Sequence, residues 1–231
     1  MRPERVTALR RWRRRGGLAL LVISPLSASA LWLTFQHKPS WYRPVLLNAD
    51  NFQRARREAV AAADDFGDKL VAGRPFEVTL RQQSVNEWLA ALPEIWPEAK
   101  DALPPELSAP AVRFEPGLLR IGAHLERAVG QTILSVDLVP EVSKDGASIG
   151  IAARALRAGS LSIPRILFER VLPWFDPQAP STAPDDRVSI GQLFSGVTSS
   201  NRFVWPNGER AFRIQSVSLI DGELHLNIEP L

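Results

Sequence analysis

Three runs in the middle of the sequence have an apolar residue at every second position, and this period constrains the fold most strongly. The runs cover residues 119–125, 132–138 and 149–155. A period of two places the apolar side chains on one face of a β-strand and the polar ones on the other. Turn signals at 116–117 and 144–146 flank the runs. The runs are predicted to form an antiparallel meander, and its apolar face, which includes Ala153 and Ala155, needs a cover.

Helices and further strands are predicted on both sides of this meander. A helix is expected from about Asn48 to Val71, with Asn48 or Asp50 able to cap it, since apolar residues recur at helical spacing and Gly73 follows. Its mixed charges and alanine-rich stripe favour packing on the domain over lying on the lipid surface. Residues 76–81 alternate like a strand, and residues 82–92 favour a second helix, with Ser84 and Glu87 at the spacing of a capping box.

The rest of the chain adds turns and a final hairpin. The prolines between residues 93 and 110 are expected to break that stretch into short turns. Residues 203–205 are read as a short strand, and a hairpin around Asp221-Gly222 is expected to complete the sheet. The predicted fold class is therefore α+β: a long-stranded, curved antiparallel sheet with helices packed on one face, preceded by one N-terminal transmembrane helix.

A short segment at residues 157–172, RAGSLSIPRILFERVL, is predicted to supply the cover for the sheet. Gly159 allows a corner, and Pro164 suits the first turn of a helix. The apolar arc of this helix would contain Ile163, Ile166, Leu167, Phe168, Val171 and Leu172. Two interpretations stay open: the helix completes an ordinary core, or helix and curved sheet leave a groove for an acyl chain.

The N-terminus carries a membrane signal. Residues 16–35 contain no charged residue, which is enough length for a helix to cross a bilayer, and seven arginines precede them. Because positive charge is retained in the cytoplasm, we expect a cytoplasmic basic tail (1–15), an anchor (16–36), a linker (37–47) and an exported domain (48–231). Trp32, Trp41 and Tyr42 are expected in the outer interfacial belt of aromatic residues.

A cleaved signal peptide is the alternative to an anchor. Ala28-Ser29-Ala30 fits the small-residue cleavage pattern, so the chain could be secreted after cleavage following Ala30. The apolar run continues to Phe35, which favours the anchor. Both interpretations place the main domain outside the cytoplasm, in the cell envelope of a bacterium.

Charge and cysteine content narrow the classes of function. The chain has a formal net charge of +3, but the arginine-rich tail supplies the excess, so the exported domain is slightly acidic. An acidic domain argues against a nucleic-acid partner. The chain has no cysteine, which excludes disulfides, thiolate nucleophiles and sulfur ligands for metals.

No pattern of catalytic residues appears in the sequence, so we expect a protein that is not an enzyme and uses neither metal nor cofactor. The three histidines are not at metal-ligand spacing, and no nucleophile elbow or phosphate-binding loop is present. His124 with Glu126, and His225 with Glu223, are pairs two residues apart on polar strand faces. Each pair is interpreted as part of a solvated surface.

The order of elements resembles the YpmS-like family of single-pass envelope proteins. The resemblance is carried by the N-terminal anchor, the following helix, the unit FEVTLRQQSVNEWL, the long strands and the GSLSIP segment before a helix. This plan is also similar to that of tubular lipid-binding domains, in which a helix lines a curved sheet. The resemblance implies a lipid-binding groove, and it offers no active residues to carry over.

Two hypotheses of function follow. In the first, the anchored domain binds lipid or another hydrophobic ligand between sheet and helix. In the second, it is a non-catalytic accessory subunit that presents a sheet edge or the proline-rich loop 173–186 to another envelope protein. The groove candidates of the first hypothesis are Leu134, Val136, Leu138, Ile149, Ile151, Leu161, Ile163, Ile166, Leu167, Phe168 and Val171.

Overall fold

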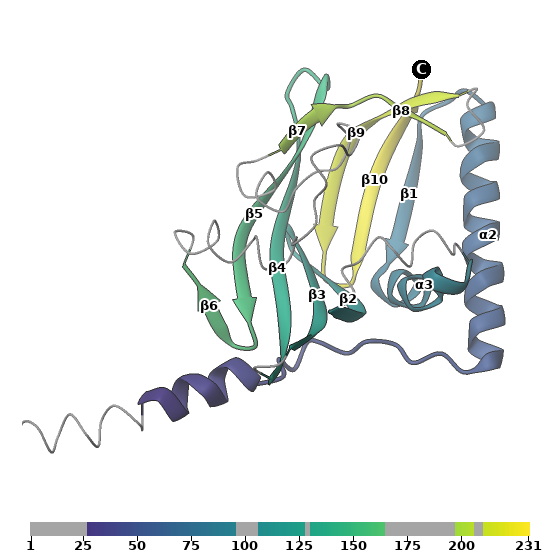
Figure 1. The fold of residues 1–231 in the computed structure, drawn as a ribbon. Coiled ribbons are helices and arrows are strands. Elements are labelled where there is room, and N and C mark those ends of the chain that lie inside the picture. Colours follow the sequence, from purple (N-terminus) through teal and green to yellow (C-terminus); the bar gives the residue numbers. More distant parts are fainter. Residues whose placement is uncertain (1–26, 96–105, 128–129, 165–196, 206–209) are drawn as a thin grey trace, which may run out of the picture.

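The computed structural model describes residues 27–95, 106–127, 130–164, 197–205 and 210–231 (Figure 1). A helix over residues 27–36 comes first. The elements that follow are α2 (Ala49–Val71), β1 (Phe76–Arg81), α3 (Gln82–Ile95), β2 (Leu107–Glu115), β3 (Leu118–Arg127), β4 (Gly130–Val142), β5 (Ser148–Ala158), β6 (Leu161–Ile163), β7 (Val197–Ser200), β8 (Phe203–Val204), β9 (Ala211–Ile220) and β10 (Glu223–Pro230).

The strands form two antiparallel sheets, where one was predicted. Sheet A has the order β1-β10-β9-β8, and sheet B has the order β2-β3-β4-β5-β6, with β7 paired to β5. The predicted C-terminal hairpin is present, but it pairs with β1 and not with the central meander. The α+β class is confirmed. The prediction of a single sheet was wrong, because alternation shows which residues form strands but not which strands pair with each other.

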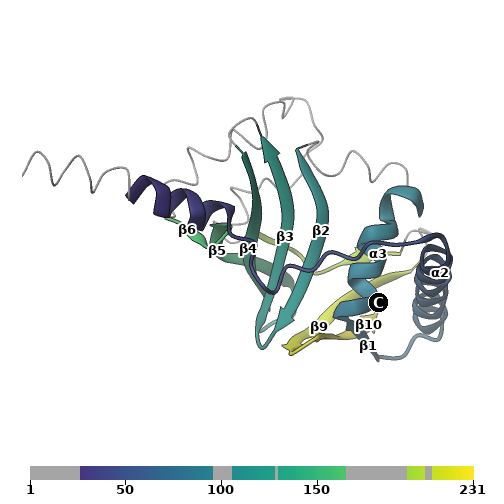
Figure 2. The same cartoon turned by 90° about the horizontal axis from the view of Figure 1, so that it is seen from below.

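The two sheets meet at their hairpin turns. The amide of Gly117, in the β2–β3 turn, donates to the carbonyl of Leu219 at 3.0 Å, and the amide of Gly222, in the β9–β10 turn, donates to Phe114 at 3.1 Å. Val112, Phe114 and Leu219 form the buried core at this junction. Figure 2 shows α3 in the corner between β2 and sheet A, so one helix packs between the sheets.

The helix α2 covers sheet A. It begins after Asn48, whose side chain accepts a hydrogen bond from the amide of Asn51, as predicted for a capping residue. Ala55 and Leu70 are fully buried on its apolar face. The ring of Phe66 packs against three other rings: Phe76 of β1, Phe212 of β9 and Trp205, which directly follows β8. The predicted packing of this helix on the domain is confirmed.

The helix α3 differs from its prediction at both ends. It begins at Gln82, ahead of the predicted cap Ser84, and Glu87 accepts a hydrogen bond from Gln83 instead of closing a capping box. It also continues through Pro93 to Ile95. The prolines after it do not all lie in turns either, since β2 starts at Leu107 and contains Pro110, next to a register shift.

A β-bulge in β5 changes which residues face inward. Leu138 pairs with Ala153, but Asp137 pairs with Ala155, so Arg154 is the extra residue. Ala155 therefore lies on the face of Asp137, and the prediction that it points inward with Ala153 was wrong. Leu156 takes the inward position instead, opposite Val136.

The GSLSIP segment forms a hairpin. Gly159 has a φ of 61°, and Leu161–Ile163 returns along β5 as strand β6. Ile163 was predicted to belong to the covering helix, but it pairs with Leu156 in the sheet. The remaining arc of that helix, from Ile166 to Leu172, lies outside the described residues, as does the loop 173–186.

Candidate functional site

An apolar strip lies on the inward face of sheet B. Its buried centre is Leu156, and the partly buried side chains around it are Leu134, Val136, Ala153 and Ile163. Pairing places Val136, Leu156 and Ile163 side by side across β4, β5 and β6. These five residues are the apolar strip. The part of these side chains that stays exposed is a surface on which an apolar group would bind favourably.

The predicted groove residues divide into three groups. Leu134, Val136 and Ile163 belong to the apolar strip. Leu138 is buried beside the strip, and Leu161 of β6 pairs with Ala158 of β5. The others flank or fall outside the strip: Ile149 and Ile151 lie at the far end of β5 and pair with β7, whereas Ile166, Leu167, Phe168 and Val171 are outside the described residues.

Leu156, the centre of the strip, was missed in the sequence. Steps of two from Ile149 lead to Ala155, and the extra residue Arg154 shifts this count by one. The signal that could have indicated the bulge is that Leu156 is the bulkier apolar residue, and steps of two backward from it lead to the charged Arg154 and not to Ala153.

The opposite face of sheet B carries a charged network. Asp137 is 4% exposed, and it accepts hydrogen bonds from Arg120 at 2.6 and 3.2 Å and from Arg157 at 2.5 Å. Burial alone would raise the pKa of Asp137, but the bonds from the two guanidinium groups outweigh burial and lower it. Arg120 also contacts Glu115 at 3.1 Å. Asp137 is therefore a charged group that holds three strands in register.

Residues 37–47 run along this face of sheet B. The ring of Trp41 lies against Gly122, and the guanidinium of Arg120 sits 5.5 Å from the ring centre. Tyr42 is 2% exposed and donates to the carbonyl of Ala109 at 2.6 Å. Burial raises the pKa of the Tyr42 hydroxyl. Tyr42 was predicted in the aromatic belt at the membrane, and its place in the core overturns that prediction.

The helix at 27–36 ends against the turn between β5 and β6. The amide of Ser160 donates to the carbonyl of Thr34 at 3.0 Å, and the hydroxyl of Thr132 donates to that of Phe35. The side chains of Ser160 and His37 are 2.6 Å apart. We call these contacts the latch. No helix in the described part of the chain is long and apolar enough to cross a membrane, and residues 16–26 of the predicted anchor lie outside that part.

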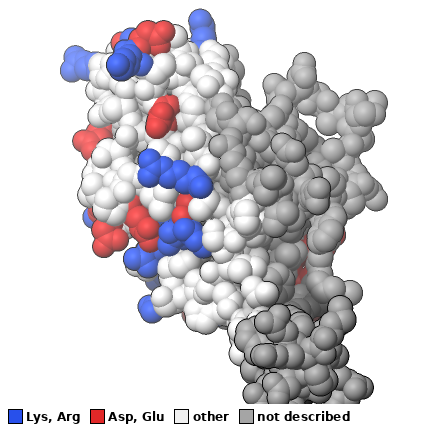
Figure 3. Space-filling view, turned by 90° about the vertical axis from the view of Figure 1, so that its left-hand side faces the viewer, with Lys and Arg blue, Asp and Glu red and all other residues white. Residues whose placement is uncertain are grey.

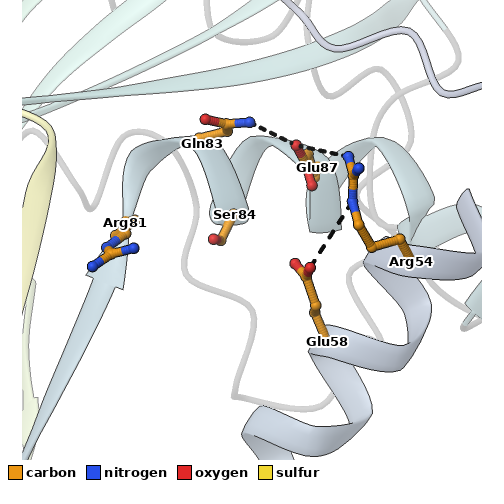
Figure 4. Close-up of a pocket in the computed structure, with 6 residues that line it drawn as sticks. All are labelled: Arg54, Glu58, Arg81, Gln83, Ser84 and Glu87. Atoms are coloured by element: carbon orange, nitrogen blue, oxygen red, sulfur yellow. Dashed lines mark hydrogen bonds and ion pairs between the residues drawn. The ribbon is translucent and has the colours of Figure 1, made fainter. Parts of the chain in front are cut away.

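A polar cleft of about 270 Å³ separates α2 from α3 (Figure 4). Arg54 points from α2 toward Glu87 of α3 at 3.7 Å and toward Glu58 at 3.9 Å. Gln83 donates to Glu87 at 3.0 Å. Because these charges are paired with each other, the cleft offers little excess charge for a ligand, and its contacts join the two helices.

His225 lies on the exposed face of sheet A between two carboxylates. Its Nδ1 is 2.7 Å from Glu77, and its Nε2 is 3.2 Å from Glu223. The hydrogen bond with Glu77, followed by that with Glu223, raises the pKa of His225. Thr79 also approaches Nδ1, at 3.2 Å, but the contact with Glu77 is shorter, so the arrangement does not activate the Thr79 hydroxyl.

His225 and Glu223 lie together on a polar strand face, as expected from the sequence, whereas Glu77 comes from another strand and was not foreseen. Among the described residues, no group of three histidine or acidic side chains is arranged to hold a metal ion. The apolar strip therefore stands out as the candidate functional site.

Comparison with protein-family models, with curated proteins and with solved structures returned no match for this chain.

Proposed function

We propose that this protein is a membrane-anchored, non-catalytic domain of the cell envelope that receives the acyl chain of a lipid on the apolar strip of sheet B. The proposal follows from the position of the strip. Leu134 and Leu156 lie on the same strands as Thr132 and Ala158, next to the turn that the helix at 27–36 contacts. An apolar surface beside the end of an anchor is well placed to take a lipid from the bilayer.

The size of the strip suits an acyl chain. The strip runs across β4, β5 and β6, and all of its side chains are aliphatic. Neighbouring strands are about 4.8 Å apart, so three strands offer a path of roughly 10 Å. A path of this length covers on the order of eight methylene groups, and each buried methylene contributes about 0.8 kcal/mol.

The experiment uses the full chain in phospholipid vesicles that contain a lipid with a photoactivatable group near the end of its acyl chain. After irradiation and proteolysis, mass spectrometry identifies the labelled peptides. We expect label on peptides from β4 and β5 in addition to label on residues 16–36. Label confined to residues 16–36 would reject the proposal.

A matched pair of variants controls for folding. Val136→Asn places an amide in the strip, whereas Val139→Asn places the same change in the same strand on the opposite face. We expect the first variant to lose label on β5 and the second to keep it, with circular dichroism confirming that both fold. Equal labelling of the two variants would argue for the alternative, an accessory subunit that binds an envelope protein.

A further inference from the structure

The closest backbone contact around the latch is at Gly159. A Cβ atom at this position would lie 2.3 Å from the carbonyl oxygen of Phe35, 2.6 Å from that of Thr34 and 2.9 Å from that of His37. Real Cβ atoms do not approach oxygen so closely, and the φ of 61° disfavours a side chain as well. Only glycine lets the end of the helix at 27–36 lie on this turn.

The latch also satisfies the end of that helix. The last carbonyl groups of a helix lack partners within the helix. Here the amide of Ser160 and the hydroxyl of Thr132 bond to two of them, those of Thr34 and Phe35. Trp32 adds a side-chain contact, because its ring lies against Gly130 at the start of β4. The helix is thereby fixed to β4 and to the turn between β5 and β6.

The chain after the helix provides no hinge. Between His37 of the latch and the buried ring of Tyr42 lie four residues, and one of them is Trp41, which packs on Gly122. The amide of Tyr42 also bonds to the carbonyl of Pro39 at 3.0 Å, which closes a turn. A segment tied at both ends over so few residues cannot act as a flexible tether.

The direction of the helix defines which side of the domain faces a membrane. In Figures 1 and 2 the helix projects from the domain on the side of β6, and α2 lies on the opposite side. Leu31 and Leu33 of this helix are 55% and 68% exposed, as expected for side chains that face lipid. Figure 3 views the side of β6: the lowest part of the described surface carries few charged residues, whereas Lys, Arg, Asp and Glu side chains gather above it and toward the left of the view.

We infer that the latch holds the domain in one orientation on the membrane, with the β6 edge of sheet B toward the lipid surface and α2 away from it. The inference rests on the proposed membrane anchor and goes further, because an anchor alone would leave the domain free to tumble. It also gives the apolar strip a fixed approach to the outer leaflet, since Ile163 belongs both to β6 and to the strip.

The absence of cysteine makes the orientation measurable. One cysteine is placed in β6 by Ser162→Cys or in α2 by Ala61→Cys, both at exposed positions, and is labelled with a donor fluorophore. The full chain is reconstituted in vesicles of phosphatidylcholine and phosphatidylglycerol that carry an acceptor dye on lipid headgroups. We expect higher energy transfer from residue 162 than from residue 61.

Two glycine variants test the latch itself. Gly159→Ala introduces the clash, whereas Gly146→Ala is its matched control: it has a φ of 68°, and the nearest atom to its new Cβ is 4.0 Å away. We expect the difference in transfer between the two label positions to be lost in Gly159→Ala and kept in Gly146→Ala. Thr132→Val, which removes one bond of the latch, should reduce the difference even if Gly159→Ala does not fold.

Each outcome separates the orientation from the proposed function. Two results would overturn the orientation: equal transfer from both label positions in the otherwise unchanged chain, and a difference in transfer that stays the same in every latch variant. Neither result would bear on lipid labelling of the strip, which tests the proposed function separately. If the chain failed to float with vesicles, the anchor itself would be wrong, and the inference would fall with it.

Discussion

Asp137→Asn should destabilise the domain strongly, because it removes the carboxylate charge that lies within hydrogen-bonding distance of two arginines of sheet B, Arg120 and Arg157. The carboxylate accepts three hydrogen bonds from Arg120 and Arg157 and is 4% exposed. Removing one partner of a buried ion pair costs about 3–5 kcal/mol. The lower end applies here, since Arg120 keeps Glu115 at 3.1 Å and the Arg157 side chain is 32% exposed.

A loss of about 3 kcal/mol corresponds to a fall in the melting temperature of roughly 6–12 °C for a domain of this size. The melting temperature is measured on the full chain in detergent by circular dichroism. Glu141→Gln is the matched control, because Glu141 is an exposed carboxylate on the same strand. A fall for Asp137→Asn no larger than for Glu141→Gln would refute this account of the network.

The same residue predicts a pH dependence. The pKa of Asp137 is lower in the folded chain than its ordinary value. Its contribution to stability is therefore fully present above the unfolded pKa, about 3.9, and is lost as the pH falls through the folded pKa. We expect the melting temperature of the unchanged chain to drop below about pH 4 more steeply than that of Asp137→Asn. Parallel curves would contradict the assignment.

Two further predictions concern other polar contacts. The amide of Asn86 is buried and bonds both to the N–H and to the C=O of Val112, at 2.7 and 3.0 Å, so Asn86→Leu should cost about 3 kcal/mol in urea denaturation. A cost below 1 kcal/mol would be inconsistent with these bonds. The NMR titration of His225 should give a pKa above that of a free imidazole, and Glu77→Gln should lower it more than Glu223→Gln does. The stabilisation from His225 is present below its unfolded pKa and is lost as the pH rises through the folded one.

Local patterns in the sequence predicted much of the fold. The cap at Asn48, the helix to Val71 and the alternating strands were all recognisable, because a period of 3.6 or 2 is written into a single segment. Turn residues such as Gly117 and Gly222 predicted the hairpins, because glycine readily adopts the positive φ of tight turns. Both glycines have a positive φ in the structure.

Features that depend on distant parts of the chain could not be predicted. The pairing of β1 with β10 divides the strands into two sheets, and no pattern within either strand specifies the partner. The burial of Tyr42 depends on Ala111 and Ile133, which are remote in sequence. Of the candidate site, the alternation predicted Leu134 and Val136, whereas the bulge at Arg154 concealed Leu156.

The central claim is that sheet B holds a lipid, and native mass spectrometry tests it most directly. A protease site inserted before residue 27 would release the folded domain with its latch helix after purification from the membrane. The account predicts a species heavier than the bare chain by one phospholipid or fatty acid, and loss of that species in Val136→Asn but not in Val139→Asn. A folded domain with only its bare mass would contradict the claim and favour the accessory subunit.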